Sequence, residues 1–200
     1  NVIMPRPSFD PAEALQMIAE EQITDVHIVP TQLISLLNLP DIEQYDLHRL
    51  KRIWYAASPM PTEVLKRGLA VFGPIFMQGY GQTESGPDVT FLNKANHRDA
   101  MGSTEAQSVL ASCGQPCIRV HVRIVDEAGR DVEAGKIGEI IVESKRNMTE
   151  YWRKPDETKE TIRDGWLYTG DLGYYDEKGF IYIADRKKDM IITGGENVYP

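Results

Sequence analysis

Residues 78–86 (QGYGQTESG) combine the side chains that a nucleotide site requires. Tyr80 offers a flat ring for a base, and the glycines on either side of it let a backbone approach closely. Thr83 supplies a hydroxyl for a phosphate group, and Glu84 supplies a carboxylate of the kind that holds Mg²⁺. On composition alone a polar turn with a core tyrosine and a solvated glutamate explains the stretch equally well, because short glycine motifs often match by chance.

Other stretches carry polar side chains at places where a ligand could bind. Residues 55–60 (YAASPM) follow an expected strand, and ligands of open α/β sheets bind beyond the carboxyl ends of the strands. Asp171 follows Gly170 at a strand end, where its carboxylate could accept hydrogen bonds from two ribose hydroxyls or simply form a Gly-Asp turn. By themselves, residues 185–189 (DRKKD) indicate a solvated charge run and residues 193–197 (TGGEN) a flexible turn.

The elements that must position these residues alternate between helix and strand over the first hundred residues. Helices are expected after the capping residues Asp10, Thr31 and Thr62, and Gly73 is expected to end the third helix. Such an alternation predicts helical crossovers and a parallel sheet. The expected strands are residues 25–30, 50–57 and 74–77.

After about residue 105 the pattern changes to short strands separated by turns. Residues 119–126 (RVHVRIVD) alternate with a period of two, and residues 176–179 (DEKG) predict a hairpin turn with glycine at a positive φ. Several short strands with regular turns indicate a small antiparallel sheet or barrel. The other expected strands are residues 136–143, 165–169, 172–175 and 180–184.

The composition excludes several classes of protein. With 42% hydrophobic residues and a net charge of −8, the chain is neither disordered, collagenous nor a coiled coil, and the acidic balance argues against nucleic acid as a partner. No apolar run approaches the roughly 20 residues that span a bilayer. Cys113 and Cys117 are too few for a disulfide framework or a full zinc site, so we expect buried or half-buried thiols in a reducing compartment.

Several residues that could carry chemistry are expected to be structural. His27 is expected to be a packed or edge histidine, whereas His97 and His121 are expected at the surface. Packing roles are expected for Phe76, Met77, Trp54, Trp152 and Trp166.

Taken together, these motifs resemble the adenylate-forming superfamily of acyl-CoA synthetases, aryl-CoA ligases, luciferases and peptide synthetase adenylation domains. The resemblance covers nearly the whole chain, through residues 9–33 (FDPAEALQMIAEEQITDVHIVPTQL), 80–84 (YGQTE) and 165–200. The form of residues 185–200 (DRKKDMIITGGENVYP) is similar to the acyl-CoA synthetase branch.

The resemblance implies a two-step reaction with ATP, Mg²⁺ and coenzyme A. A carboxylic acid attacks the α-phosphate of ATP to give an acyl-adenylate and pyrophosphate, and the thiol of coenzyme A then displaces AMP. Because the substrate is itself the nucleophile, the enzyme mainly positions the reactants and stabilises phosphate charge.

The resemblance also implies roles for individual residues. Tyr80 would stack on adenine, Thr83 would contact the α-phosphate, and Glu84 would hold Mg²⁺. Asp171 and Arg186 would grip the two ribose hydroxyls. The full nucleotide site would comprise Ala57, Ser58, Gln78, Gly79, Tyr80, Gly81, Thr83, Asp171 and Arg186. Beyond it, Lys188 would be the hinge of a small C-terminal domain, and Gly194 and Gly195 would let the pantetheine arm pass.

Two parts that the family has are missing from these 200 residues: a phosphate loop ending in Pro-Lys-Gly and the C-terminal domain with its catalytic lysine. We therefore expect a fragment of the large N-terminal domain that is inactive by itself. It would contain an α/β part at 1–105, a β part at 106–184, and the hinge with the start of a truncated domain at 185–200.

Other functions remain open at this point. The acceptor could be a carrier-protein thiol, an amine or oxygen in place of coenzyme A, and a non-catalytic nucleotide-binding module is also possible. The sequence does not identify the acid or the oligomeric state. A cytoplasmic location is expected, with peripheral membrane association if the acid is a long-chain fatty acid.

Overall fold

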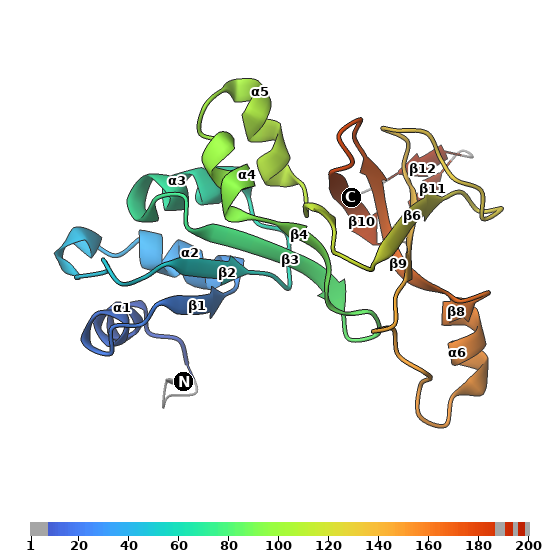
Figure 1. The fold of residues 1–200 in the computed structure, drawn as a ribbon, viewed down its shortest axis with the longest axis horizontal. Coiled ribbons are helices and arrows are strands. Elements are labelled where there is room, and N and C mark those ends of the chain that lie inside the picture. Colours follow the sequence, from blue (N-terminus) through green and yellow to red (C-terminus); the bar gives the residue numbers. More distant parts are fainter. Residues whose placement is uncertain (1–7, 187–190, 194–195, 199–200) are drawn as a thin grey trace. The chain divides into compact units, whose positions relative to one another are not determined.

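The structure is a computed structural model that describes residues 8–186, 191–193 and 196–198. Within these residues a sheet with parallel strands and flanking helices comes first, and an antiparallel sheet follows (Figure 1). The predicted mixed α/β class is therefore confirmed. No helix in this described part of the chain is long and apolar enough to cross a membrane. The chain divides into two compact units.

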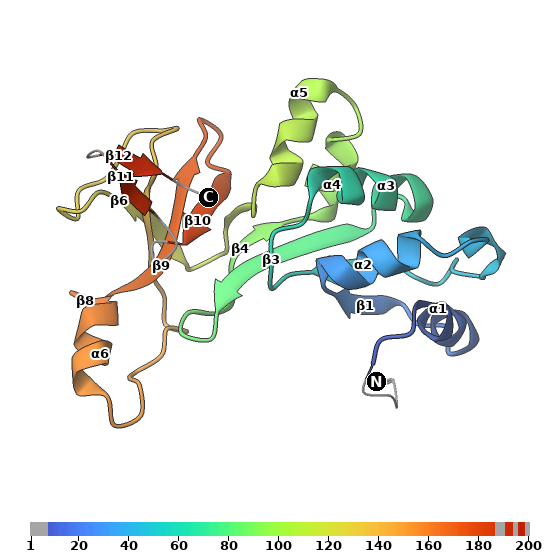
Figure 2. The ribbon, with the colours of Figure 1, turned by 180° about the vertical axis from the view of Figure 1, so that it is seen from behind.

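The first unit comprises residues 1–78 and 93–111. Strands β1, β2 and β3 are parallel, and α2 and α3 make the crossovers that parallel neighbours need. Figure 2 shows α2 and α3 on the same face of these strands. The elements are α1 (Pro11–Glu20), β1 (Asp25–Ile28), α2 (Pro30–Leu37), the 3₁₀ turn η1 (Ile42–Gln44), β2 (Arg52–Tyr55), α3 (Thr62–Phe72), the start of β3 (Phe76–Gln82), α4 (Lys94–Asp99), α5 (Thr104–Gln107) and the 3₁₀ turn η2 (Ser108–Ala111).

Local sequence signals explain where most of these helices begin and end. Asp10 caps α1, since its carboxylate accepts the N–H groups of residues 12 and 13 at 3.0 and 3.1 Å. Gly73, at φ 73°, ends α3 as predicted. Thr31 and Thr62 are not N-caps, which corrects the prediction: each already lies inside its helix. Helix α2 begins two residues earlier than a cap at Thr31 would give, because proline at position 30 has the fixed φ of a first helical residue.

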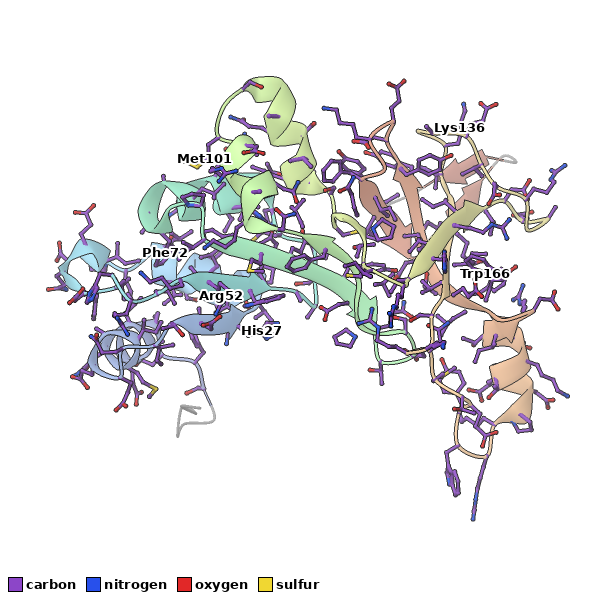
Figure 3. All side chains as sticks on the ribbon, in the orientation of Figure 1. His27, Arg52, Phe72, Met101, Lys136 and Trp166 are labelled. Atoms are coloured by element: carbon purple, nitrogen blue, oxygen red, sulfur yellow. The ribbon has the colours of Figure 1, made fainter. Side chains whose placement is uncertain are left out.

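The core of the first unit is formed by the apolar faces of α1, α2 and α3 against the parallel strands. Phe76 is fully buried, as predicted, and Met77 is partly buried. His27 lies exposed on β1, the edge strand of the sheet (Figure 3), so it is an edge histidine. Fully buried members of this core are Leu15, Leu33, Ile53, Tyr55, Leu65 and Phe76.

His97 lies in the core, so the prediction of a surface position is wrong. Its side chain is 0% exposed. The carbonyl of Asn93 accepts from Nδ1 at 2.8 Å, and the hydroxyl of Tyr55 donates to Nε2 at 2.9 Å. Both ring nitrogens therefore have partners, which is the condition under which a buried polar side chain is tolerated. Burial lowers the pKa of His97 to about 4, so the imidazole is neutral at pH 7.

The second unit comprises residues 79–92 and 112–200. Its larger sheet is antiparallel, with strand order β10-β9-β7-β6, and α6 with β8 leads into β9. The elements are the end of β3, β4 (Gly86–Leu92), β5 (Gln115–Pro116), β6 (His121–Val125), β7 (Gly138–Glu143), α6 (Pro155–Thr161), β8 (Ile162–Arg163), β9 (Trp166–Tyr175), β10 (Ile181–Arg186), β11 (Ile191–Thr193) and β12 (Glu196–Val198).

Strand β9 replaces the two strands predicted at 165–169 and 172–175. Gly170, at φ 72°, lets the chain continue through an irregularity where the register of β7 against β9 shifts. The hairpin turn between β9 and β10 forms as predicted, with Gly179 at φ 77° donating its N–H to the carbonyl of Asp176 at 2.9 Å.

The remaining structural predictions for this unit have mixed outcomes. Cys113 is buried and Cys117 half-buried, both as free thiols, and His121 is exposed, all as predicted. Trp166 is partly buried (Figure 3). Trp152 is 79% exposed, so its predicted packing role is wrong. The side chain that turns inward at this point is that of the preceding residue, Tyr151, which is described below.

Candidate nucleotide site

The stretch that carries the glycine-rich motif is a strand and a hairpin turn. β3 continues through Gln82, well beyond the predicted strand end at residue 77, and β4 starts at Gly86. A Cβ atom on Gly81 would collide with the carbonyl oxygen of Gly86, and one on Gly79 would lie 2.8 Å from Oδ1 of Asp88. Gly81 is therefore required by the close approach of the β3 and β4 backbones, whereas a side chain at position 79 would displace only the Asp88 carboxylate.

The hairpin turn between these strands is held by a buried hydroxyl. Oγ of Ser85 accepts the N–H of Gln82 at 3.0 Å, and the N–H of Ser85 is donated to the carbonyl of Gln82 at 3.2 Å. Ser85 is buried, whereas Thr83 at the tip of the turn is exposed and Glu84 is half-buried. The fixed turn therefore leaves Thr83 open to solvent.

The carboxylate of Asp171 accepts hydrogen bonds from two side chains of β3, the strand that carries the motif. The hydroxyl of Tyr80 donates to its Oδ2 at 2.8 Å, and Nε2 of Gln82 donates to the same oxygen at 2.8 Å. Asp171 is only 5% exposed. Burial and the nearby Asp171 carboxylate both raise the pKa of Tyr80, which keeps its hydroxyl protonated as a donor. The structure thus brings together Tyr80 and Asp171, which lie 91 positions apart.

The irregularity in β9 fixes the backbone around Asp171. Oγ1 of Thr169 donates to the carbonyl of Ile140 at 2.7 Å and accepts the N–H of Asp171 at 3.1 Å. The N–H of Gly170 is donated to Oε1 of Glu139 at 3.2 Å. These contacts with β7 hold the Asp171 backbone where the strand departs from regular pairing.

The other predicted members near the C-terminal end are placed only in part. The backbone register of β9 against β10 pairs Arg186 with Asp171. Lys188, Gly194 and Gly195 lie outside the described residues.

Glu84 is held by a segment that sequence reasoning did not single out. The hydroxyl of Tyr151 donates to Oε1 of Glu84 at 2.9 Å, and the N–H of Met148 is donated to the Glu84 carbonyl at 2.6 Å. Burial and the adjacent Glu84 raise the pKa of Tyr151. Neither Tyr151 nor Gln82 was predicted, and Tyr151 lies 67 positions from Glu84 with no local signal linking them.

A half-buried, oriented carboxylate such as that of Glu84 fits Mg²⁺, which favours oxygen ligands. Among the residues that the structure describes, no group of three or more His, Cys, Asp and Glu side chains is arranged to hold a metal ion. Mg²⁺ that arrives with ATP needs no such group, because one or two carboxylates together with phosphate oxygens and water complete its shell.

Three predicted members lie in the first unit. Ala57 is exposed and has φ 74°, a conformation that non-glycine residues rarely adopt and that is often associated with ligand sites. Ser58 beside it is also exposed. Gln78 pairs with Tyr55, the last residue of β2, so Gln78 lies beside the carboxyl end of β2, which the 57–58 segment follows.

The chain is similar to known proteins along its length. The sequence profile of the family described as AMP-binding enzyme matches residues 1–152. The medium/long-chain-fatty-acid–CoA ligase FadD8 of Mycobacterium tuberculosis is 44% identical over 192 residues, which cover 96% of this chain and 32% of that protein. The chain spans about a third of the length of the curated relatives it matches.

Solved structures resemble the chain in fold as well. The amide bond synthetase McbA from Marinactinospora thermotolerans matches with a TM-score of 0.86 and 32% identity, over 96% of this chain and 37% of that one. The O-succinylbenzoate coenzyme A synthetase MenE from Bacillus subtilis, in complex with ATP and magnesium ion, matches with a TM-score of 0.79 and 30% identity, over 96% and 38%.

Proposed function

Because this chain belongs to the AMP-binding enzyme family, we propose that the full-length protein is an ATP-dependent carboxylate–CoA ligase. The superfamily predicted from the sequence is thereby confirmed, while the reaction remains the proposal. The protein would form an acyl-adenylate and pyrophosphate from a carboxylic acid and ATP, and then a thioester and AMP from the adenylate and coenzyme A.

The observation that carries the proposal is the cluster around Asp171, in which Tyr80 and Gln82 both donate to one carboxylate oxygen. With this geometry the Tyr80 ring would lie against adenine while Asp171, with Arg186 opposite it, would take the ribose. The other residues that the family resemblance assigns to the nucleotide belong to the same proposal: Ala57, Ser58, Gln78, Gly79 and Gly81.

The residues of the hairpin turn between β3 and β4 would contact the phosphate groups and Mg²⁺. Thr83 is exposed, and its hydroxyl would contact the α-phosphate, while the Glu84 carboxylate would hold Mg²⁺. Mg²⁺, when bound, supplies positive charge that offsets the charge developing on the phosphate oxygens. The hydroxyl of Tyr151 is uncharged, so it would orient the Glu84 carboxylate without neutralising the negative charge that attracts Mg²⁺.

For the substrate, we propose a fatty acid or an aryl acid, with coenzyme A as acceptor. The name of the Mycobacterium tuberculosis relative supports a fatty acid and coenzyme A. Transfer of the acyl group to an amine is the second candidate, and the similarity to an amide bond synthetase favours it. Lys188 as hinge and Gly194 and Gly195 as the path of the pantetheine arm belong to the same proposal, as do the domain boundaries at residues 105 and 184.

The location proposed for this reaction is the cytoplasm, where the free thiols of Cys113 and Cys117 would stay reduced.

The test is pyrophosphate release by the full-length protein with Mg-ATP and a panel of fatty and aryl acids, with and without coenzyme A. Release that depends on one acid class and turns over only with coenzyme A supports the proposal. Turnover with amines in place of coenzyme A would favour the second candidate. If no acid gives release while ATP still binds, the protein is a nucleotide-binding module and the proposal is wrong.

A further inference from the structure

We propose that Gln82 is a positioning residue that holds the Asp171 carboxylate in the orientation in which it grips ribose. The inference rests on the proposed function, since it takes Asp171 to be the ribose ligand. Gln82 itself need not touch the nucleotide. Its side chain would act through Asp171.

The amide of Gln82 makes a two-point contact with β9. Nε2 donates to Oδ2 of Asp171 at 2.8 Å and to the carbonyl oxygen of Thr169 at 2.9 Å. Both partners are acceptors, so the nitrogen of the amide must face them. One NH₂ group therefore binds the chain on both sides of Gly170, the residue whose positive φ permits the irregularity in β9.

This arrangement restricts a side chain that would otherwise be free to turn. The χ2 torsion of aspartate has a broad energy profile, so the plane of its carboxylate is set by hydrogen bonds. The donors of Tyr80 and Gln82 meet at Oδ2 and fix that plane. Gln82 is in turn fixed at its backbone by Ser85 in the hairpin turn. Strand β3, which carries the motif, would thereby orient the Asp171 carboxylate toward the ribose, while Tyr80 on the same strand faces the base.

The proposal predicts a specific loss in recognition of the ribose hydroxyls. The dissociation constants of ATP and of 2′,3′-dideoxy-ATP are measured by titration calorimetry with the full-length protein. The dissociation constant of 2′,3′-dideoxy-ATP divided by that of ATP is the ratio that reports the contribution of those hydroxyls. Gln82→Met removes the donor at nearly constant volume, and it should lower the ratio about fivefold, as expected for weakening a hydrogen bond to a charged group. Gln82→Glu keeps the shape without the donor, and at pH 8 it should lower the ratio as well.

Gln115→Met is the matched control. Nε2 of Gln115 donates to the carbonyl of Lys178 at 2.8 Å in the same unit, so this variant loses an amide-to-carbonyl bond that does not involve Asp171. Its ratio should equal that of the unmodified protein. Circular dichroism verifies that each variant is folded, and Gln82→Glu decides the question if Gln82→Met is not.

Asp171→Asn separates failure of this inference from failure of the proposed function. If Asp171→Asn lowers the ratio and the folded Gln82 variants do not, Gln82 has no positioning role, and the ribose assignment stands. If Asp171→Asn leaves the ratio unchanged, Asp171 is not the ribose ligand, and both proposals are wrong at this residue. If the ratio falls for Asp171→Asn and for the Gln82 variants but not for Gln115→Met, the positioning role of Gln82 is supported.

Discussion

Acidification should destabilise the first unit through His97. The imidazole is buried and neutral, with Nδ1 donating to the Asn93 carbonyl and Nε2 accepting from the Tyr55 hydroxyl. A second proton would fall on Nε2, displace the Tyr55 donor and place a charge in the apolar core. Unfolding releases the ring to water, where protonation is easy.

The sign and size of the effect follow from the two pKa values. The pKa of His97 falls from 6.5 to about 4 on burial. Between these values the unfolded chain binds a proton that the folded chain does not, so the stabilisation is fully present above pH 6.5 and is lost as the pH falls toward 4. At about 1.4 kcal/mol per pH unit, the loss reaches roughly 3 kcal/mol in total, of which about 2 kcal/mol has occurred by pH 5.

The assay is urea unfolding between pH 7.5 and 5, with the unmodified protein compared with His97→Phe. The variant is less stable at pH 7.5, because the Tyr55 hydroxyl loses its acceptor at a cost of about 1–3 kcal/mol. Its deficit should shrink by about 2 kcal/mol at pH 5, since it cannot be protonated there. His121→Phe, at an exposed position of β6, should keep the full acid-dependent loss. A constant deficit for His97→Phe, or a midpoint near 6.5 for His97 in C2-hydrogen exchange, would refute the reasoning.

Three further outcomes are expected. Asp171→Ala should weaken ATP binding by calorimetry by about 1–3 kcal/mol, the worth of charge-assisted hydrogen bonds; unchanged affinity would remove Asp171 from the ribose site. Tyr151→Phe should raise the Mg²⁺ concentration needed for half-maximal ATP binding about tenfold, because Glu84 loses its orienting donor. Tyr182→Phe, which removes another tyrosine–carboxylate bond in this unit, should have no such effect, and an equal effect would contradict the assignment. The Cys113 thiol, whose pKa burial raises to about 12, should resist iodoacetamide at pH 8 until the protein unfolds, as followed by mass spectrometry; rapid labelling of the folded protein would contradict its burial.

The parts of the fold that depend on neighbouring residues could be predicted from the sequence. The cap at Asp10, the stop at Gly73 and the hairpin glycine at 179 each act within a few positions, where backbone geometry decides. The alternation of elements likewise sufficed for the fold class.

The failures concern contacts between distant positions. The prediction ended β3 at residue 77, because a strand rich in glycine and polar residues has no β-propensity, and it missed β4 altogether. The burial of His97 depends on Tyr55, 42 positions away. The hydrophobic periodicity of the sequence does not predict a contact between residues so far apart. For the same reason Gln82 and Tyr151 could not be selected, although the residues they hold were named by resemblance.

The separation of Tyr80 from Asp171 also constrains when the site can form during synthesis. Tyr80 leaves the ribosome 91 residues before Asp171, a delay of about 5–18 s at the usual rate of about 5–20 residues per second. Until then the hydroxyl of Tyr80 and the amide of Gln82 lack the carboxylate that they bind. If the cluster binds ATP as proposed, the nucleotide can stabilise the chain through it only after synthesis has passed β9. Early folding of the first unit must rely on its own apolar core.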